Sequence, residues 1–145
     1  MIVRLLGADE AKLLEGVVEG VFDHPVDATW ARDFFEDERH HLAVALDGTD
    51  VVGMASGVHY VHPDKAPELW INEVGVAETH RRQGLASALV RALLDHGRQL
   101  GCTDAWVLTE AENEAANELY RRAGGAREPA VLYAWSLRGD AGESP

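Results

Sequence analysis

The part of this 145-residue chain best suited to bind an anion is a basic, glycine-containing turn within residues 74–86. A strand-like apolar pattern leads into Arg-Arg-Gln-Gly at residues 81–84, and a helical pattern begins at Leu85. The N–H groups in the first turn of a helix have no helical partner and carry partial positive charge. Gly84 would let the main chain approach oxygen atoms closely. The pattern predicts a pyrophosphate cradle, with an ordinary solvated turn as the alternative.

The turn differs from the two best-known phosphate-binding sequences. No Gly-Lys-Ser/Thr follows, as it would in a P-loop, and the second and third glycines of a dinucleotide fingerprint are missing. The basic turn also stands out in an acidic chain, since 13 basic and 25 acidic residues give a formal net charge of −12. Such a surface disfavours binding to nucleic acid and to anionic membranes. It would attract polycations, and the alternative interpretation is that the acidity only keeps the protein soluble.

The first half of the chain is expected to supply a strand, two helices and a hairpin before the basic turn. Asp9 and Asp27 precede apolar residues at helical spacing and are predicted helix N-caps. An Asp-Gly pair at residues 47–48 predicts a hairpin turn. The expected ranges are a strand at 2–6, a helix at 9–21, a short helix after Asp27, and strands at 41–46 and 51–61.

The second half predicts a strand-helix-strand unit followed by a further helix and strand. Gly101 is expected to end the long helix, and Gly124-Gly125 to end the shorter one. The expected ranges are strands at 68–77, 105–108 and 130–137, and helices at 84–100 and 113–123. This order predicts a mixed α/β sheet flanked by helices, with an antiparallel front half and a βαβ crossover behind it. Residues 1–137 are expected to form one domain and residues 138–145 a disordered tail.

Cellular location follows from what the chain lacks. No apolar run approaches the roughly 20 residues of a membrane span, and residues 1–6 do not resemble a secretion signal. The single cysteine, Cys102, cannot form an internal disulfide and is interpreted as a packing residue. These features predict a cytoplasmic protein. Metal binding is not expected, because His59 and His62 would point to opposite faces of a strand and His80 lies further on.

Two motifs resemble those of the GCN5-related N-acetyltransferases. Residues 81–86 match the family's Arg/Gln-x-x-Gly-x-Gly/Ala signature, and residues 113–124 match its Asn-x-x-Ala-x-x-Leu-Tyr-x-x-x-Gly helix. Both lie in family order and at family spacing, although Gly125 stands where the family usually has Phe. The resemblance implies the fold of that family and acetyl-coenzyme A (acetyl-CoA) as co-substrate. The residues it assigns to coenzyme binding are Val74, Val76, Arg81, Arg82, Gln83, Gly84, Leu85, Ala86, Asn113 and Tyr120.

The resemblance also implies roles in direct acetyl transfer to an amine. The N–H group of Val76, or of Val74 if the register is offset, would stabilise the oxyanion. Tyr120 would be the general acid, and its alternative is an ordinary helix aromatic packed on the sheet. Asn113 would bind the pantetheine amide, although an N-cap role alone explains an asparagine there. Glu73 is the candidate general base, because it is expected to be partly buried and burial would raise the pKa of its carboxylate. The alternative is that Glu73 is a surface carboxylate without a catalytic role and that water accepts the proton.

The acceptor is expected to be a small cationic amine. Residues 68–84 resemble the same segment of the small aminoglycoside 3-N-acetyltransferases, and Glu110 and Glu112 are candidates for binding ammonium groups. Polyamines, protein lysines and protein N-termini are alternative acceptors, and a non-catalytic acetyl-CoA sensor is an alternative of another class. Exposed Tyr133 or Trp135 could serve a homodimer interface. An acidic wall beside the acceptor is expected from Asp23, Asp27, Asp33, Glu36, Asp37 and Glu38, which a solvated face would equally explain.

Overall fold

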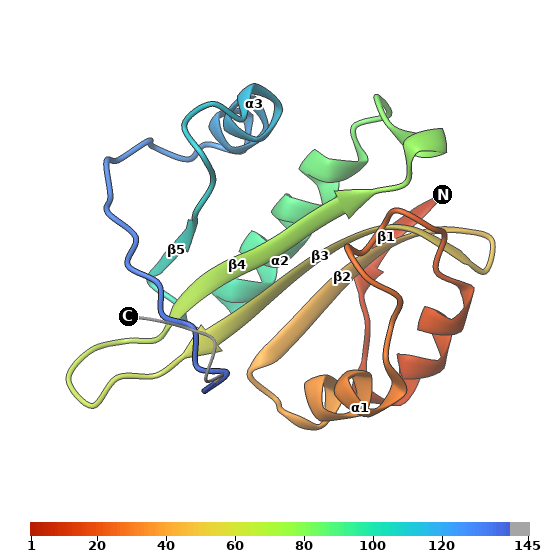
Figure 1. Cartoon of the computed structure of the whole chain (residues 1–145), viewed down its shortest axis with the longest axis horizontal. Helices are drawn as coiled ribbons and strands as arrows, with labels where there is room; N and C mark the ends of the chain where they lie inside the picture. The colour runs from red at the N-terminus through yellow and green to blue at the C-terminus, as the bar shows by residue number, and fades with distance from the viewer. Residues whose placement is uncertain (140–145) are drawn as a thin grey trace.

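Five strands form one sheet in chain order, β1 to β5, in a computed structural model that describes residues 1–139 (Figure 1). The first four strands pair antiparallel, whereas β4 and β5 pair parallel. The strands are β1 (Ile2–Leu5), β2 (His40–Asp47), β3 (Asp50–Tyr60), β4 (Glu68–Val76) and β5 (Asp104–Val107). This sheet confirms the expected antiparallel front half followed by a parallel crossover.

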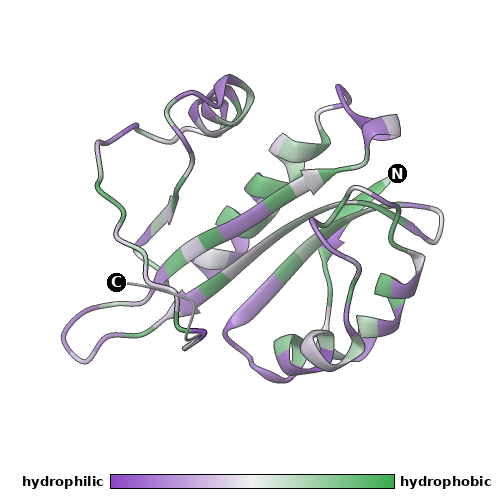
Figure 2. Ribbon diagram, in the orientation of Figure 1, coloured by the Kyte–Doolittle hydropathy of each residue, from purple (hydrophilic) through white to green (hydrophobic). Residues whose placement is uncertain are grey.

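The helices lie on both sides of the sheet. Figure 1 shows α2 (Leu85–Gln99) behind β2 to β4, while the 3-10 helix η1 (Ala8–Gly16) and α1 (Ala28–Glu36) lie in front. The short 3-10 helix η2 (Glu78–His80) leads from β4 toward α2, and α3 (Glu114–Arg122) follows β5 and contacts α2. Leu89 and Leu93 of α2 are fully buried against the sheet. Hydrophobic and hydrophilic residues alternate along the first part of β4, as its two different faces require (Figure 2).

Several local predictions are confirmed. Asp47 and Asp50 face each other across a two-residue turn in which Gly48 has a φ of 62°. The Asp27 carboxylate accepts hydrogen bonds from the N–H groups of Thr29 and Trp30 at the start of α1. Gly101, with a φ of 86°, follows the end of α2. These are signals that depend only on neighbouring residues.

The expected helix at 9–21 is wrong in type and extent. The chain forms the shorter η1, whose N-cap is Gly7 in place of the expected Asp9. Glu10 causes the shift, because its carboxylate accepts from the Gly7 N–H at 2.8 Å and pairs with Arg4 at 2.7 Å. Gly16 ends η1 where a Cβ would lie only 2.8 Å from the Thr49 carbonyl oxygen. Tertiary contact with the hairpin therefore stops the helical pattern early.

The expected last strand is also absent, since residues 126–137 lie within the described part of the chain and form neither helix nor strand. α3 ends in a Schellman motif, with the Gly125 N–H donating to the Tyr120 carbonyl at 2.9 Å and the Gly124 N–H to that of Arg121 at 3.0 Å. A β-type pattern shows only a preference, because a strand also needs a neighbouring strand. The expected tail at 138–145 lies, from residue 140 onward, outside the described residues.

Three histidines from different elements form a hydrogen-bonded chain that the sequence did not indicate. His41 of β2 lies between His59 of β3, at 2.7 Å, and His96 of α2, at 3.1 Å. Burial, and to a smaller extent the neighbouring histidines, lower the pKa of His41 from 6.5 to about 4. Burial also lowers the pKa of His96.

This depressed pKa predicts acid-sensitive stability. The unfolded chain takes up the His41 proton below pH 6.5 whereas the folded chain resists uptake until about pH 4. Stability is therefore lost as pH falls, by about 1.4 kcal/mol between about pH 7.5 and about pH 5.5 from this group alone. His41→Gln should remove that part of the pH dependence in urea titrations. His24→Gln, at an exposed position before α1, should keep the wild-type dependence; equal slopes in wild type and H41Q would contradict the assignment.

Candidate active site

The candidate site begins where β4 and β5 separate. Their parallel pairing ends at Ile71 and Val107, while β4 continues to Val76 alongside β3. Figure 1 shows the two strands diverging toward the end of β4 that leads to α2. The last part of β4 therefore has no strand on its β5 side among the described residues, and its backbone groups there are available to another molecule.

The backbone N–H groups of Val74 and Val76 face this opening. The Ala77 N–H donates to the Val52 carbonyl at 2.8 Å, which fixes the alternation of hydrogen-bonding directions along the strand. In the register that pairs Val76 with Gly53 and Val74 with Ala55, the N–H groups of these two valines point away from β3. This direction is the one that a thioester carbonyl binding between the strands would require.

The basic turn closes one end of the opening. Gly84 is the N-cap of α2 with a φ of 76° and has no side chain to cap the helix, so the N–H groups of the first turn face outward. The first helical bond runs from the Ala88 N–H to the Gly84 carbonyl at 3.1 Å. A Cβ at Gly84 would meet nothing within 4 Å, so the space in front of the loop is open. These features fit a bound pyrophosphate.

The two arginines of the turn are exposed, and local contacts and backbone conformation partly fix their positions. Arg82 has a φ of 63° and is the one non-glycine residue with a positive φ among residues 1–139. Such a conformation costs about 1 kcal/mol, and strain of this kind is common in ligand-binding loops. Arg81 donates from Nε to the Val76 carbonyl at 3.3 Å, which ties the turn to β4. Gln83 is exposed, Leu85 is buried in the core, and Ala86 is half-buried.

A β-bulge in β4 directs Glu73 toward the front of the sheet. Ser56 pairs with Glu73 and Gly57 with Ile71, so Asn72 is the extra residue of the bulge. Sequence reasoning missed this bulge, although a signal existed. Buried Leu69 and Ile71 are two apart, but the next inward valine comes three residues later, which breaks the period of two.

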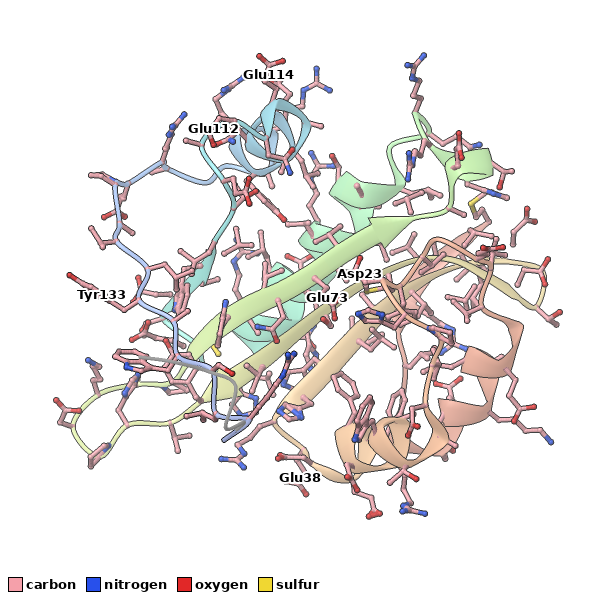
Figure 3. All side chains as sticks on the ribbon, viewed as in Figure 1. Asp23, Glu38, Glu73, Glu112, Glu114 and Tyr133 are labelled. Carbon is pink, nitrogen blue, oxygen red and sulfur yellow. The ribbon has the colours of Figure 1, made fainter. Side chains whose placement is uncertain are left out.

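Glu73 is exposed, so the expectation of a partly buried base is wrong. Its surroundings are set by Gly75, where a Cβ would overlap the Val21 carbonyl oxygen. The loop before α1 therefore lies directly over β4, and exposed Asp23 follows two residues after this contact. Figure 3 shows Asp23 and Glu73 over the same central part of the sheet. Two exposed carboxylates thus lie on the front of the sheet over its central part.

The remaining acids of the expected wall are distributed differently. Asp27 is used as the N-cap of α1, and Asp37 pairs with Arg39 at 3.1 Å. Hydrogen bonds from Arg39 lower the pKa of Asp37 to about 2. Glu38 lies far from Glu73 in Figure 3. The group formed by Asp33, Glu36, Asp37, Glu38 and Arg39 lines a separate shallow hollow. Of the six acids, Asp23 lies over the same central part of the sheet as Glu73 (Figure 3).

The other side of the opening is built by the β5–α3 connection. Asn113 is the N-cap of α3: its Oδ1 accepts from the Ala116 N–H at 3.0 Å, leaving the side-chain amide nitrogen as a donor. Tyr120 is half-buried against the core, and burial raises the pKa of its phenol. The phenol therefore holds its proton at neutral pH. Glu110 and Glu112 are exposed on this connection, and Figure 3 shows Glu112 at the α3 end.

His59, His62 and His80, which were weighed as possible metal ligands, contact different partners. His59 belongs to the three-histidine chain, His62 lies 3.2 Å from Glu68, and His80 lies 2.8 Å from Asp47. In the described part of the chain no group of three or more metal-binding side chains is placed to hold an ion. Cys102 packs against the core, and burial raises the pKa of its thiol. No helix within residues 1–139 is long and apolar enough to cross a membrane.

Comparison with known proteins places this geometry in a family. The chain belongs to the Acetyltransferase (GNAT) family, whose sequence model matches residues 10–125. It is 34% identical over 122 residues to the L-2,4-diaminobutyric acid acetyltransferase of Streptomyces coelicolor, covering 80% of this chain and 68% of the relative. It is also 34% identical over 114 residues to the mycothiol acetyltransferase of Paenarthrobacter aurescens, covering 74% of this chain and 34% of that one. The protein is therefore an acetyl-CoA-dependent N-acetyltransferase.

Solved structures confirm the fold. An aminoglycoside acetyltransferase from an uncultured soil metagenomic sample, in complex with trehalose, superposes with a TM-score of 0.83 at 18% identity, covering 94% of this chain and 96% of that one. An aminoglycoside N-acetyltransferase, AAC(6')-Iy, in complex with CoA superposes with a TM-score of 0.76 at 19% identity, covering 94% of each chain. At these identities the likeness concerns the fold.

Proposed function

We propose that the enzyme acetylates a primary amine of a small polycationic acceptor, an aminoglycoside, by direct attack on the thioester. The observation that carries this proposal is the pair of exposed carboxylates, Asp23 and Glu73, beside the outward-facing amides of Val74 and Val76. A formal net charge of −12 would attract such an acceptor, and the carboxylates would orient its ammonium groups. The 3-amine is the position that the sequence resemblance suggests.

Different elements of the chain bind the coenzyme and stabilise the transition state. Bound acetyl-CoA supplies the activated acetyl group. The first turn of α2 and the loop ending at Gly84 hold the diphosphate, with Arg81, Arg82 and Gln83 at its edge. The Val74 and Val76 N–H groups donate to the developing oxyanion. Tyr120 donates its proton to the leaving thiolate. Because burial raises the pKa of the phenol, this proton transfer requires the phenol to lie close to the sulfur.

The acceptor side relies on carboxylates. Glu73 accepts a proton from one ammonium group of the acceptor, directly or through one water, so that the neutral amine attacks the thioester carbonyl. Asp23 holds a second ammonium group. Glu110 and Glu112, on the β5–α3 connection, bind further amines. Asn113 contributes its side-chain amide to the pantetheine arm. We place this activity in a single domain, residues 1–137, acting in the cytoplasm as a homodimer without nucleic-acid or membrane partners.

A panel of acceptors tests the proposal. Release of free thiol from acetyl-CoA should be fastest with kanamycin or gentamicin and slower with spermidine, L-2,4-diaminobutyrate and a lysine peptide. NMR of the product identifies the acetylated amine. Preference for diaminobutyrate or for the peptide would overturn the aminoglycoside assignment, while leaving the acetyltransferase class intact.

Replacing the candidate base tests its role. Glu73→Gln should lower kcat/KM for the preferred amine about 10- to 100-fold near neutral pH, because the ammonium loses its positioned proton acceptor. The defect should shrink as pH approaches the pKa of the amine, where the acceptor is already neutral. Glu38→Gln, an exposed change of the same charge away from Glu73, should leave kcat/KM nearly unchanged. An equal effect of both variants would reduce Glu73 to general electrostatic attraction.

A further inference from the structure

Two tryptophans form an exposed aromatic platform on the front of the sheet. Leu69 faces α2, because a Cβ at Gly97 would lie 3.1 Å from its side chain, so alternation along β4 turns Trp70 to the opposite, front face. Trp106 of β5 pairs with Trp70, and the two rings stack with their centroids 5.0 Å apart and 12° between their planes. Trp70 is still 38% exposed and Trp106 36% exposed. The platform therefore presents aromatic surface to solvent although its two rings pack on each other.

Hydrogen bonds hold the platform in one arrangement. The Trp106 Nε1–H group donates to the Tyr60 hydroxyl oxygen at 2.8 Å, and the Tyr60 hydroxyl donates to Glu68 Oε1 at 3.4 Å. The Tyr60 ring meets the Trp106 ring edge to face, with 86° between their planes. The second carboxylate oxygen of Glu68 lies 3.2 Å from His62 Nε2. Side chains that are already fixed lose little rotational freedom when a ligand binds, so this surface suits binding.

The platform lies next to one carboxylate and on the same face of the sheet as another. Glu68 comes two residues before Trp70 on the front face of β4. It has no Lys or Arg partner, since the ion pairs of these residues within residues 1–139 involve other acids. The bulge at Asn72 turns Glu73 to the front face as well. Trp70 and Glu73 are three positions apart, which corresponds to about 10 Å of strand. A molecule made of several linked rings can therefore contact Glu73 and the platform at once.

We infer that the platform is a distal acceptor subsite: it binds a ring of the acceptor other than the one whose amine is acetylated, while Glu68 pairs with an ammonium group of that ring. Such a subsite rests on the proposed function, because it presumes an acceptor with several amino-sugar rings. The face of an indole ring carries partial negative charge, so it attracts ammonium groups and the polarised C–H groups of an amino sugar. Glu68 adds a full negative charge at the rim. The platform thus favours multi-ring acceptors over single-ring amines and small amino acids, which do not reach it.

Acceptors of different length test the subsite. With kanamycin, which has several linked rings, Trp70→Ala should raise KM about 10-fold and change kcat less than about twofold, because a contact remote from the reacting amine stabilises substrate and transition state equally. With 2-deoxystreptamine, a single ring, both constants should stay at their wild-type values. Trp70→Phe keeps an aromatic face and should hold KM for kanamycin within about threefold of wild type. Trp30→Ala is the matched control and should change neither constant, because Trp30 is 75% exposed on α1, which packs on η1 and β2.

Glu68→Gln provides a second variant that does not remove a ring. It should raise KM for kanamycin about fivefold and leave KM for 2-deoxystreptamine constant, because only the longer acceptor brings an ammonium group to this carboxylate. The increase should shrink as salt is added, since the lost contact is one between charges. An acetyl-CoA affinity within about twofold of wild type, measured by calorimetry, shows that W70A and E68Q are folded.

Calorimetric titration of the CoA-loaded enzyme with kanamycin separates binding from acetyl transfer. Equal KM values for kanamycin in wild type, W70A and E68Q would overturn the subsite and leave the proposed function intact. An equal rise of KM for kanamycin and 2-deoxystreptamine would do the same. If wild type binds kanamycin about 10-fold more tightly than W70A but does not acetylate it, the subsite stands and the proposed function fails. Kanamycin that wild type neither binds nor acetylates would overturn both.

Discussion

Gly84→Asp should abolish measurable coenzyme binding. The substitution places a carboxylate at the N-terminus of α2, where the proposed diphosphate lies against free N–H groups. Two like charges about 4 Å apart repel by about 4 kcal/mol near a protein surface, so we expect acetyl-CoA affinity to fall by at least about 100-fold. Isothermal titration calorimetry with acetyl-CoA and with CoA measures this directly. Acetyl transfer should disappear in parallel.

Gly84→Asn separates charge from backbone strain. Gly84 has a φ of 76° and space around its Cβ direction, and Asn and Asp are both among the residues that tolerate this conformation best. The two side chains have nearly the same shape, so Asn should keep binding within about 10-fold of wild type. If Asp and Asn weaken binding equally, the loop acts through its conformation. If neither weakens it, the diphosphate lies elsewhere and the site assignment fails.

Tyr120→Phe should lower kcat about 100-fold or more while changing acetyl-CoA affinity less than about threefold, because a general acid contributes to the transition state and not to ground-state binding. Burial already raises the pKa of the phenol, so the wild-type rate should decline only at strongly alkaline pH. The phenylalanine variant should lose that decline. Steady-state kinetics across pH, with titration of the coenzyme, provides both readouts.

Tyr133→Phe is the control for Tyr120→Phe. Tyr133 is 76% exposed on the segment after α3, and loss of its hydroxyl group should leave the rate unchanged. Should Y120F keep the full rate, Tyr120 would be a packing residue on α3, and proximity and the β4 amides would account for the catalysis. Water would then supply the proton to the leaving thiolate.

Much of the fold could be predicted because its signals are local. The Asp-Gly turn, the Asp27 cap and the glycine after α2 each need only a few neighbouring residues to form their contacts. Predictions that depended on distant partners were less successful. η1 ends early against Thr49, and residues 130–137 form no strand within the described chain. The bulge at Asn72 was not predicted, because it depends on how β4 pairs with β3. The three-residue spacing between inward residues of β4 was the local signal that could have indicated it.

The sequence by itself determined the class of enzyme, because the basic turn and the Asn-to-Tyr helix are contiguous motifs whose chemistry depends on residue type and spacing. Only the tertiary structure decided which groups meet at the site. Among residues 1–139, the Val74 and Val76 N–H groups have no strand partner, because β3 pairs with the opposite edge of β4 and the pairing with β5 ends at Val107. Asp23 reaches the front of β4 because Gly75 admits the Val21 carbonyl. Pairing register and close backbone approach arise between segments distant in the chain, where no local pattern records them.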